Sequence, residues 1–463
     1  MVNATYDASG DLYSSTGTIF NMGDIAWTLA STALVWIMIP GNVLNMIYLS
    51  MMTVAMVFFQ VQYFALRNVL NQPSIGSPRV PAIVFCVFQL MFAAITYVMI
   101  SMVSYSEHSC NSSPMIALGA IAERSRLGPL LAFVFIWSTL VYDPIACWTW
   151  NSQGWSYVLG GLDFAGGTPV HISSGTAALA ISLYLGKRRG YGTERLAYKP
   201  HNTTYVILGM VFLWFGFNGG SALSANLRAT QACIVTNLAA SVGGLTWMLW
   251  DYRLERKWSV VSFCSGAIAG LVAITPGSGF VGSPAAVLFG FMAGTVCNFA
   301  TQLKFIFKYD DTLDIFASHA IGGIAGNVLT GLFAQASIAS ADGVVTIPGG
   351  WLDQNYRQLG IQLADSVSGL SYSFVMTTII LWVMHFIPGL RIRCDEETEI
   401  LGVDDAEMGE FAYDYVALEN EVMPRSEYNA ASSGSREPQH TTATTSQISE
   451  EKQIGEEDVS RVQ

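Results

Sequence analysis

Two histidines, His171 and His319, could do chemistry, because each lies within a long apolar run. An ionisable side chain at the centre of a membrane-spanning helix costs roughly 3 kcal/mol or more, so it is a candidate functional residue. Each histidine has an aspartate eight positions before it and a glycine four positions after it. These residues are Asp163 and Gly175 for His171, and Asp311 and Gly323 for His319, with Asp314 as a further acidic residue. The repeated spacing indicates two related segments, and chance is the alternative.

The histidine pair is compatible with several kinds of site. A zinc site needs three or four ligands, but no third His, Cys or Glu stands at helical spacing from His171 or His319. We therefore predict no metal and no cofactor. A structural hydrogen bond between helices is a second alternative. Neutral imidazoles that donate and accept hydrogen bonds along a narrow pore fit the paired placement better.

Acidic and aromatic residues surround the first histidine. Asp163 can cap the helix that follows it, and it places a negative charge there. Trp148, Trp150 and Trp155 precede it. Tryptophans commonly anchor a protein at the membrane boundary, and beside a carboxylate they can also hold a small cation. Three phenylalanines fit either an apolar core or a gate: Phe88, Phe92 and Phe217.

The composition indicates what surrounds these residues. The 463 residues are 52% hydrophobic and 12% charged, whereas soluble domains carry about 25% charged residues. The apolar residues form continuous blocks of about 20, the length of a membrane-spanning helix. The sequence therefore predicts an all-α polytopic membrane protein. It does not predict an enzyme, because neither a nucleophile nor a metal set accompanies the histidines.

We expect eleven transmembrane helices. Their ranges are 25–40, 44–66, 81–105, 127–147, 167–186, 204–226, 231–250, 258–275, 280–302, 314–335 and 360–388. The fifth and tenth spans carry the histidines, so the first ten spans form two halves of five. Halves with an odd number of helices lie in opposite orientations. This predicts a five-plus-five inverted repeat, with the site near the midplane, plus a final helix.

The loop charges predict the orientation, because Lys and Arg concentrate in cytoplasmic loops. One set of alternate loops holds 12 of these residues and the other set holds 4. We therefore expect an extracellular N-terminus (residues 1–24), a transmembrane domain (25–388) and a cytoplasmic tail (389–463).

The tail carries the acidity of the chain. Between residues 394 and 463 there are 18 acidic and four basic residues, against a net charge of −12 for the whole chain. Nucleic acid is therefore not an expected partner. From about residue 426 the tail is rich in Ser, Thr, Gln and Glu, which predicts disorder. A kinase acting on it would add charge and could move it. A tail without a role is the alternative.

Four long motifs carry a resemblance to a known family. They are GAIAERSRLGP (119–129), LDFAGGTPVHISSG (162–175), FGFNGGSALSAN (215–226) and DDTLDIFASHAIGG (310–323). They resemble the ammonium transporters of the Amt/Mep/Rh family, in its fungal Mep branch. The resemblance extends from about Pro114 to Tyr415. It implies a homotrimer in the plasma membrane, each subunit having eleven helices in two inverted halves around its own pore.

The resemblance assigns an ammonium recruitment site to one end of the pore. Trp150, Ser221 and Phe88 would form this site, and Asp163 would support it. The substrate would be ammonium, and the protein would serve nitrogen uptake.

The resemblance also assigns the path beyond recruitment. Phe92 and Phe217 would form a stacked phenylalanine gate. His171 and His319 would be the twin histidines of the pore, and Trp214 would line the conduction path. Ammonium would lose its proton after recruitment and pass as NH3 along the imidazoles. Whether the proton follows is left open.

In the tail, Glu399, Gly402 and Asp404 resemble a regulatory motif of the family. Two alternatives to transport remain open: an ammonium-sensing receptor that signals through this tail, and a non-conducting paralogue. An uptake assay separates both of them from a transporter.

The first third of the chain departs from the family pattern. Stretches expected after Gly41 and after Gln60 are absent, and about three residues are missing before Phe217. Residues 97–113 are an addition that interrupts the expected third helix. Misread intron boundaries, a decaying paralogue and a functional insertion are the explanations considered.

Overall fold

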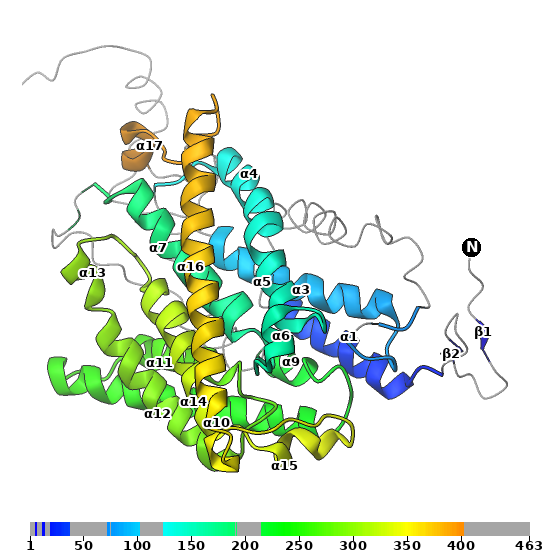
Figure 1. The fold of residues 1–463 in the computed structure, drawn as a ribbon. Coiled ribbons are helices and arrows are strands. Elements are labelled where there is room, and N and C mark those ends of the chain that lie inside the picture. Colours follow the sequence, from blue (N-terminus) through cyan, green and yellow to red (C-terminus); the bar gives the residue numbers. More distant parts are fainter. Residues whose placement is uncertain are drawn as a thin grey trace, which may run out of the picture. The chain divides into compact units, whose positions relative to one another are not determined.

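The computed structural model describes residues 5–6, 12–13, 19–37, 72–74, 76–101, 124–189, 191 and 214–401. This part of the chain is predominantly helical (Figure 1). One short antiparallel pair joins β1 (Thr5–Tyr6) to β2 (Leu12–Tyr13). The predicted span 44–66 and the tail beyond residue 401 lie outside the described residues.

In chain order, the described helices fall into two groups. The first group is α1 (Met22–Ile37), α3 (Ala82–Ser101), α4 (Leu127–Trp137), the π-helical turn η3 (Ser138–Tyr142), α5 (Asp143–Trp150), α6 (Trp155–Leu159), the π-helical turn η4 (Gly167–Ile172) and α7 (Ser173–Leu185). The second group is α9 (Trp214–Gly220), α10 (Leu227–Glu255), α11 (Val260–Ile274), α12 (Ser283–Ala300), α13 (Leu303–Phe307), the π-helical turn η6 (Phe316–Ile321), α14 (Gly322–Phe333), α15 (Ala336–Ala339), the 3-10 turns η7 (Ser340–Asp342) and η8 (Trp351–Asp353), α16 (Arg357–Phe386) and α17 (Glu396–Leu401).

Five helical stretches in the described part are long and apolar enough to cross a membrane. They are Gly128–Leu159, Leu227–Glu255, Ser283–Phe307, Phe316–Phe333 and Arg357–Phe386. Two shorter apolar helices, Ala82–Ala93 and Val260–Ile274, accompany them. The all-α class and the apolar helices agree with the sequence, whereas the count of eleven spans stays a prediction.

One predicted helix boundary was wrong. The sixth span was expected to run to residue 226, but α9 ends at Gly220 and α10 begins at Leu227. The side chain of Asn226 accepts a hydrogen bond from the Ala229 N–H at 2.9 Å, which is the contact that starts a helix. The third predicted span, 81–105, corresponds to α3, which ends at Ser101, inside the addition at residues 97–113 that was expected to interrupt this helix. The apolar residues that begin the addition continue the helix, and residues 102–113 lie outside the described part.

A proline changes the fourth predicted span, which runs on past residue 147 to Trp150. Pro144 lies in the first turn of α5 and has no N–H for the preceding helix. The π-helical turn η3 lies directly before this proline. Such turns commonly occur where the regular hydrogen-bond ladder of a helix is interrupted. Helix α5 follows this π-helical turn and ends at Trp150, which lies in its last turn.

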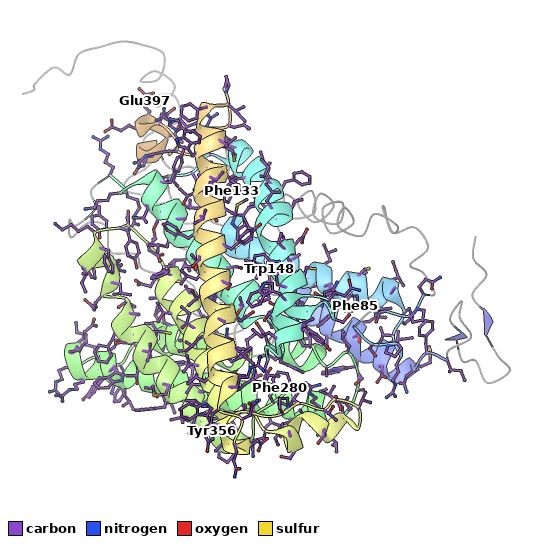
Figure 2. All side chains as sticks on the ribbon, in the orientation of Figure 1. Phe85, Phe133, Trp148, Phe280, Tyr356 and Glu397 are labelled. Atoms are coloured by element: carbon purple, nitrogen blue, oxygen red, sulfur yellow. The ribbon has the colours of Figure 1, made fainter. Side chains whose placement is uncertain are left out.

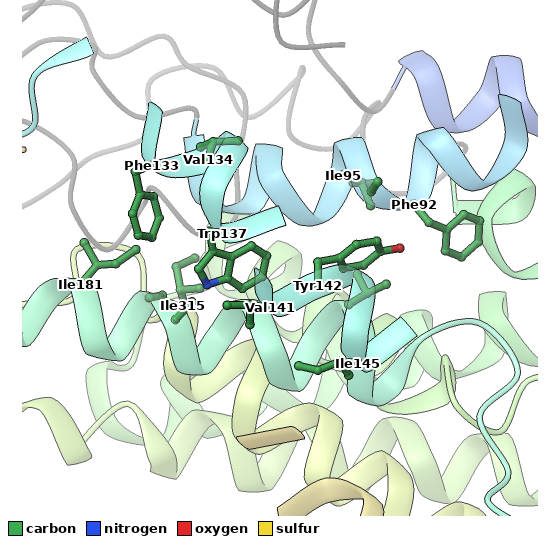
Figure 3. Packing of buried hydrophobic residues seen from close by; sticks show 14 of the residues in the cluster. Phe92, Ile95, Phe133, Val134, Trp137, Val141, Tyr142, Ile145, Ile181 and Ile315 are labelled. Atoms are coloured by element: carbon green, nitrogen blue, oxygen red, sulfur yellow. The ribbon is translucent and has the colours of Figure 1, made fainter. Parts of the chain in front are cut away.

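The long helix α16 packs against α7 and α14 (Figure 1). The indole N–H of Trp137 donates to the Thr377 hydroxyl at 2.7 Å, and this bond joins α4 to α16. Figure 3 shows the buried side chains around Trp137, including Phe133 and Tyr142 from the same helical stretch and Phe92 from α3. The apolar core therefore reaches the region of the first histidine.

A second packed group consists of α10, α11 and α12. In the first turn of α10, the guanidinium of Arg228 lies 4.9 Å from the ring centres of both Phe164 and Phe280. Phe280, labelled in Figure 2, contacts Phe164 edge-to-face. Arg228 also pairs with Asp342 at 3.0 Å. These contacts hold the loop in which Phe164 follows Asp163.

Candidate functional site

The two predicted histidines contact each other in the buried interior of the protein. The Nδ1 atoms of His171 and His319 are 3.2 Å apart. Their side chains are 0% and 1% exposed, respectively. A hydrogen bond between two Nδ1 atoms requires one to carry a proton and the other to accept it. Either ring can therefore donate a hydrogen bond to the other, depending on which Nδ1 atom carries the proton.

Both histidines occupy the same kind of backbone. His171 lies in the π-helical turn η4 directly before α7, and His319 lies in the π-helical turn η6 directly before α14. π-helical turns are rare and are frequent at functional sites. The repeated spacing thus corresponds to a repeated local structure.

The two glycines of the spacing explain how the histidine segments come so close. A Cβ atom added to Gly175 would collide with the backbone of Ala320, the residue after His319. A Cβ atom added to Gly323 would lie 2.8 Å from the side chain of Ile172, the residue after His171. The contacts are reciprocal, and each glycine gives the opposite segment room to approach.

The aspartate of each spacing binds the start of its histidine segment. Asp163 accepts hydrogen bonds from the N–H groups of Gly166, Gly167 and Thr168 at 2.7, 2.7 and 2.8 Å. Asp311 accepts one from the N–H of Phe316 at 2.9 Å. Thr168 and Phe316 both lie five residues after their aspartates. Each carboxylate therefore satisfies N–H groups that a helix start leaves without partners.

Aromatic rings lead from Trp150 to the histidines. Phe92 and Phe217 are stacked, with ring centres 4.3 Å apart and an angle of 25° between the ring planes. Trp150 meets Phe92 edge-to-face at 5.8 Å. On the other side, the Phe217 ring lies 6.3 Å from that of His171. Trp150, Phe92, Phe217, His171 and His319 thus form a continuous row, which we call the ring row.

The predicted recruitment residues each contact a member of the ring row or belong to it. Phe88 contacts Phe92 edge-to-face at 4.9 Å. The Trp150 indole N–H donates to the carbonyl oxygen of Asp163 at 3.0 Å, and the Ser221 hydroxyl donates to that of Phe217 at 2.8 Å. Trp214 is the first residue of α9, and its side chain lies outside the described part.

The predicted acidic residues of the second spacing lie among basic side chains. Lys304 pairs with Asp314 at 2.8 Å. The neighbouring Asp310 binds Arg188 at 2.9 Å, and the Arg124 guanidinium donates to its carbonyl oxygen at 2.7 Å. Burial would raise the pKa of Asp310, but the hydrogen bonds from Arg188 and the positive charge of Arg124 hold it below its ordinary value.

The beginning of the predicted tail contacts the body of the protein. Arg126 donates its N–H to the carbonyl oxygen of Ile392 at 2.7 Å, and Cys394 donates its N–H to that of Arg124 at 3.1 Å. Glu399 accepts the N–H of Arg189 at 2.7 Å and pairs with Arg393 at 2.9 Å. Of the predicted regulatory residues, Gly402 and Asp404 lie outside the described part.

One buried carboxylate close to the site, that of Asp365, was not predicted from the sequence. Asp365 lies in the apolar helix α16 and is 4% exposed. Its presence in the predicted span 360–388 was a visible signal, because ionisable residues are rare in such spans. Among the described residues, no group of three or more His, Cys, Asp or Glu side chains could hold a metal ion.

Comparison with known proteins identifies the family. Residues 26–413 match the model of the Ammonium Transporter Family. This chain belongs to the ammonium transporter family. It is 49% identical to Ammonium transporter 1 of Schizosaccharomyces pombe over 441 residues, which cover 88% of this chain and 85% of that protein. It is 41% identical to Ammonium transporter MEP2 of Saccharomyces cerevisiae over 445 residues, which cover 87% and 86%.

A solved structure of this family has the same fold. The crystal structure of Candida albicans Mep2 matches with a TM-score of 0.73 and 42% sequence identity, covering 85% of this chain and 91% of that chain. The ammonium transporters are multi-pass membrane proteins, and these relatives are named as transporters, not as enzymes. The predicted resemblance is confirmed at the level of the family.

Proposed function

We propose that this ammonium transporter recruits NH4⁺ beside Trp150, that the ion gives up one proton either to water on the entry side or to the imidazoles, and that NH3 passes along His171 and His319. The observation that carries the proposal is the ring row, which runs without interruption from an indole to two contacting imidazoles. It supports a path that is narrow, apolar at its entrance and polar only at the histidines.

Recruitment needs groups that favour a cation. The face of an indole attracts a cation within about 6 Å of the ring centre, and the Trp150 indole is held by the backbone carbonyl of Asp163, a residue that carries a buried carboxylate. The Ser221 hydroxyl uses its proton on Phe217, so its oxygen lone pairs stay available to an ammonium N–H. These three residues, with Phe88 behind Phe92, would hold NH4⁺ before the gate.

The gate would separate the cation from the pore. Phe92 and Phe217 are 1% and 0% exposed and stacked on each other, so a solute passes only if the rings move. Stripping water from a cation without replacing its hydrogen bonds is costly. NH4⁺ escapes this cost by losing a proton, whereas K⁺, which has a similar size, cannot. The gate and the histidines would therefore select ammonium by its acidity.

The arrangement in the membrane is part of the proposal. We infer eleven spanning helices in two inverted halves, a plasma-membrane location, an extracellular N-terminus and a cytoplasmic tail. Support comes from the family, from the 12 basic residues in one set of loops against 4 in the other, and from the reciprocal glycine contacts. A homotrimer with one path per subunit follows from the family resemblance.

Regulation through the tail is supported by the contacts of Arg393 and Glu399. Arg393 donates to the carbonyl oxygens of Leu185 and Lys187 while it pairs with Glu399. A phosphate added by a kinase further along the tail would compete for such basic groups. The same contacts would let a conformational change in the transmembrane domain reach the tail, as a sensor requires. An ammonium-sensing receptor is therefore the second candidate.

Uptake by cells that lack other ammonium transporters tests the proposal. We expect the protein to restore growth on low ammonium. His171→Ala and His319→Ala should each lower uptake to about a tenth or less, since leaving one member of a buried hydrogen-bonded pair alone costs about 1–3 kcal/mol. Restored signalling without uptake would favour the sensor, and failure of both would indicate a non-conducting paralogue. Unchanged uptake by both histidine variants, at equal protein in the membrane, would contradict the proposed path.

A further inference from the structure

The buried carboxylate of Asp365 lies outside both the ring row and the tail contacts. Its two oxygens accept hydrogen bonds from different helices: one from the Ser156 hydroxyl of α6 at 2.5 Å, the other from the Thr168 hydroxyl of η4. A carboxylate is costly in an apolar helix, and two hydroxyl groups offset only part of that cost.

Thr168 extends the contacts into the second histidine segment. Its hydroxyl oxygen accepts a hydrogen bond from the Asn327 amide of α14 at 2.8 Å. The same amide donates to the hydroxyl of Ser366, the residue next to Asp365, at 2.8 Å. We call Ser156, Thr168, Asn327, Asp365 and Ser366 the brace. All five side chains are buried.

The donor and acceptor of each hydrogen bond in the brace are fixed by the chemistry of its side chains. An ionised carboxylate only accepts, so Ser156 and Thr168 must donate to Asp365. Thr168 has then used its single proton, and its oxygen accepts from the –NH2 group of Asn327, which only donates. The arrangement therefore has a fixed orientation, and among the described residues only the Asn327 Oδ1 atom of the brace has no hydrogen-bond partner.

The brace joins the two histidine segments. Thr168 lies three residues before His171 in η4, and Asn327 lies eight residues after His319 in α14. The 2.8 Å contact between them ties the two segments together beside the histidine pair. The Nδ1 atoms of that pair are 3.2 Å apart, and a hydrogen bond of this kind is lost by about 3.6 Å. A shift of a few tenths of an ångström between the segments would therefore separate the imidazoles.

We propose that Asp365 is a positioning residue for transport: by holding Thr168 against Asn327, it fixes the spacing between His171 and His319. This inference rests on the proposed function. Loss of the brace opens the histidine pair to water, and a wetter pore passes hydrated cations that a dry one excludes. The brace therefore sets selectivity for ammonium over K⁺ as well as the rate of uptake.

Two changes remove the brace with little change of shape. Asp365→Asn replaces one acceptor oxygen by a donor that faces a donating hydroxyl. Thr168→Val removes the hydroxyl and keeps the branched side chain. We expect each variant, purified and reconstituted in lipid vesicles, to transport ammonium about tenfold more slowly, the change expected for about 1.4 kcal/mol. We also expect the ratio of K⁺ to ammonium permeation to rise several-fold. Thr168→Ser retains the hydroxyl and should restore both values.

Ser373→Ala is the matched control. It removes one buried hydrogen bond, from the Ser373 hydroxyl of α16 to the carbonyl oxygen of Ser173 at 2.7 Å, at a site outside the brace. This variant should leave the K⁺ to ammonium ratio at the wild-type value. A ratio that rises as much in this control as in the brace variants would overturn the proposal, because any loosening of α16 would then suffice.

The histidine variants keep this test separate from that of the proposed function. The proposed path is wrong if His171→Ala and His319→Ala leave both rate and selectivity unchanged. The brace proposal is overturned by a different result: the histidine variants alter selectivity, whereas Asp365→Asn and Thr168→Val keep the wild-type ratio at an equal amount of folded protein. Rescue in Thr168→Ser together with loss in Thr168→Val supports it even where Asp365→Asn does not accumulate.

Discussion

The segments Asp163–Leu185 and Asp311–Phe333 begin alike and then differ in what surrounds them. In both, an aspartate binds the N–H group five residues on, a histidine lies in a π-helical turn, and a glycine lets the other segment approach. The residue five positions after the aspartate is Thr168 in the first segment, where its side chain is bound to a second carboxylate, Asp365. In the second segment the corresponding residue is Phe316.

The charges near the two aspartates differ in the same way. Asp163 and Asp365 lie near each other, because one accepts the Thr168 N–H and the other the Thr168 hydroxyl. Asp311, in contrast, lies between Asp310, which pairs with Arg188, and Asp314, which pairs with Lys304. The shared features place two histidines against each other. The differences give the surroundings of Asp163 more carboxylates without basic partners than the surroundings of Asp311. On the proposed function, the negative end receives the cation, and the end with basic residues is where neutral NH3 leaves.

The largest expected effect comes from the glycines that the two segments share. Gly175→Ala and Gly323→Ala should both sharply reduce folded protein in the membrane, because each added Cβ overlaps the opposite segment and overpacking costs about 1–3 kcal/mol. Fluorescence-detected size-exclusion chromatography measures the folded fraction. Gly360→Ala is the control, since a Cβ atom there meets nothing within 4 Å. A strong loss in one glycine variant alone would show that the contacts are not equivalent.

The aspartates should differ in their effect on uptake. Asp163→Asn loses the charge that holds three N–H groups beside Trp150, and we expect uptake to fall about tenfold, as for one charge-assisted hydrogen bond. Asp311→Asn should have a smaller effect, because its charge is already offset by basic neighbours. Concentration series of ammonium uptake measure both, and the change in Asp163→Asn should include a raised KM. An equal loss in both variants would remove the functional difference between the ends.

Lys304 offers a weaker test of the same difference. Lys304→Met removes the ion pair with Asp314, whose side chains are 19% and 27% exposed. Partly exposed pairs contribute about 1 kcal/mol or less, so we expect uptake to stay within about twofold of wild type. An added Asp314→Asn change should return uptake toward wild type, since it removes the charge left unpaired. A tenfold loss in Lys304→Met would place this pair on the path itself.

The tail should show the smallest effect on stability and a regulatory effect on uptake. Glu399→Gln weakens a pair in which Arg393 is 31% exposed and Glu399 is 7% exposed. We expect the thermal stability of the purified protein to be almost unchanged, since such pairs contribute about 1 kcal/mol or less. Truncation at Arg393 should alter uptake when cells move from poor to rich nitrogen. Uptake that follows the wild type in both media would argue against regulation by the tail.

The sequence predicted those parts of the site that follow from local spacing. The two histidines, their aspartates and their glycines were found because each set spans only 13 residues. So short a spacing can be recognised in a single sequence. The resemblance added Trp150, Phe92 and Phe217, which now stand in one row. Their roles remain proposals.

The parts that the sequence did not predict depend on contacts between distant segments. Asp365 lies about 200 positions from Ser156 and Thr168, and nothing in its own span indicates these partners. The change from π-helix to α-helix within the histidine segments also has no local signal, because apolar residues fit both. The boundary at Asn226, by comparison, had a visible sign in a helix-starting side chain.

The central claim is that the path selects ammonium because ammonium can lose a proton. The most direct test records currents or ion fluxes with the purified protein in lipid vesicles, under equal gradients of ammonium and then of K⁺. The account predicts transport with ammonium and none with K⁺, and it predicts that His171→Ala and His319→Ala weaken this distinction. A K⁺ flux equal to the ammonium flux in the unaltered protein would contradict it.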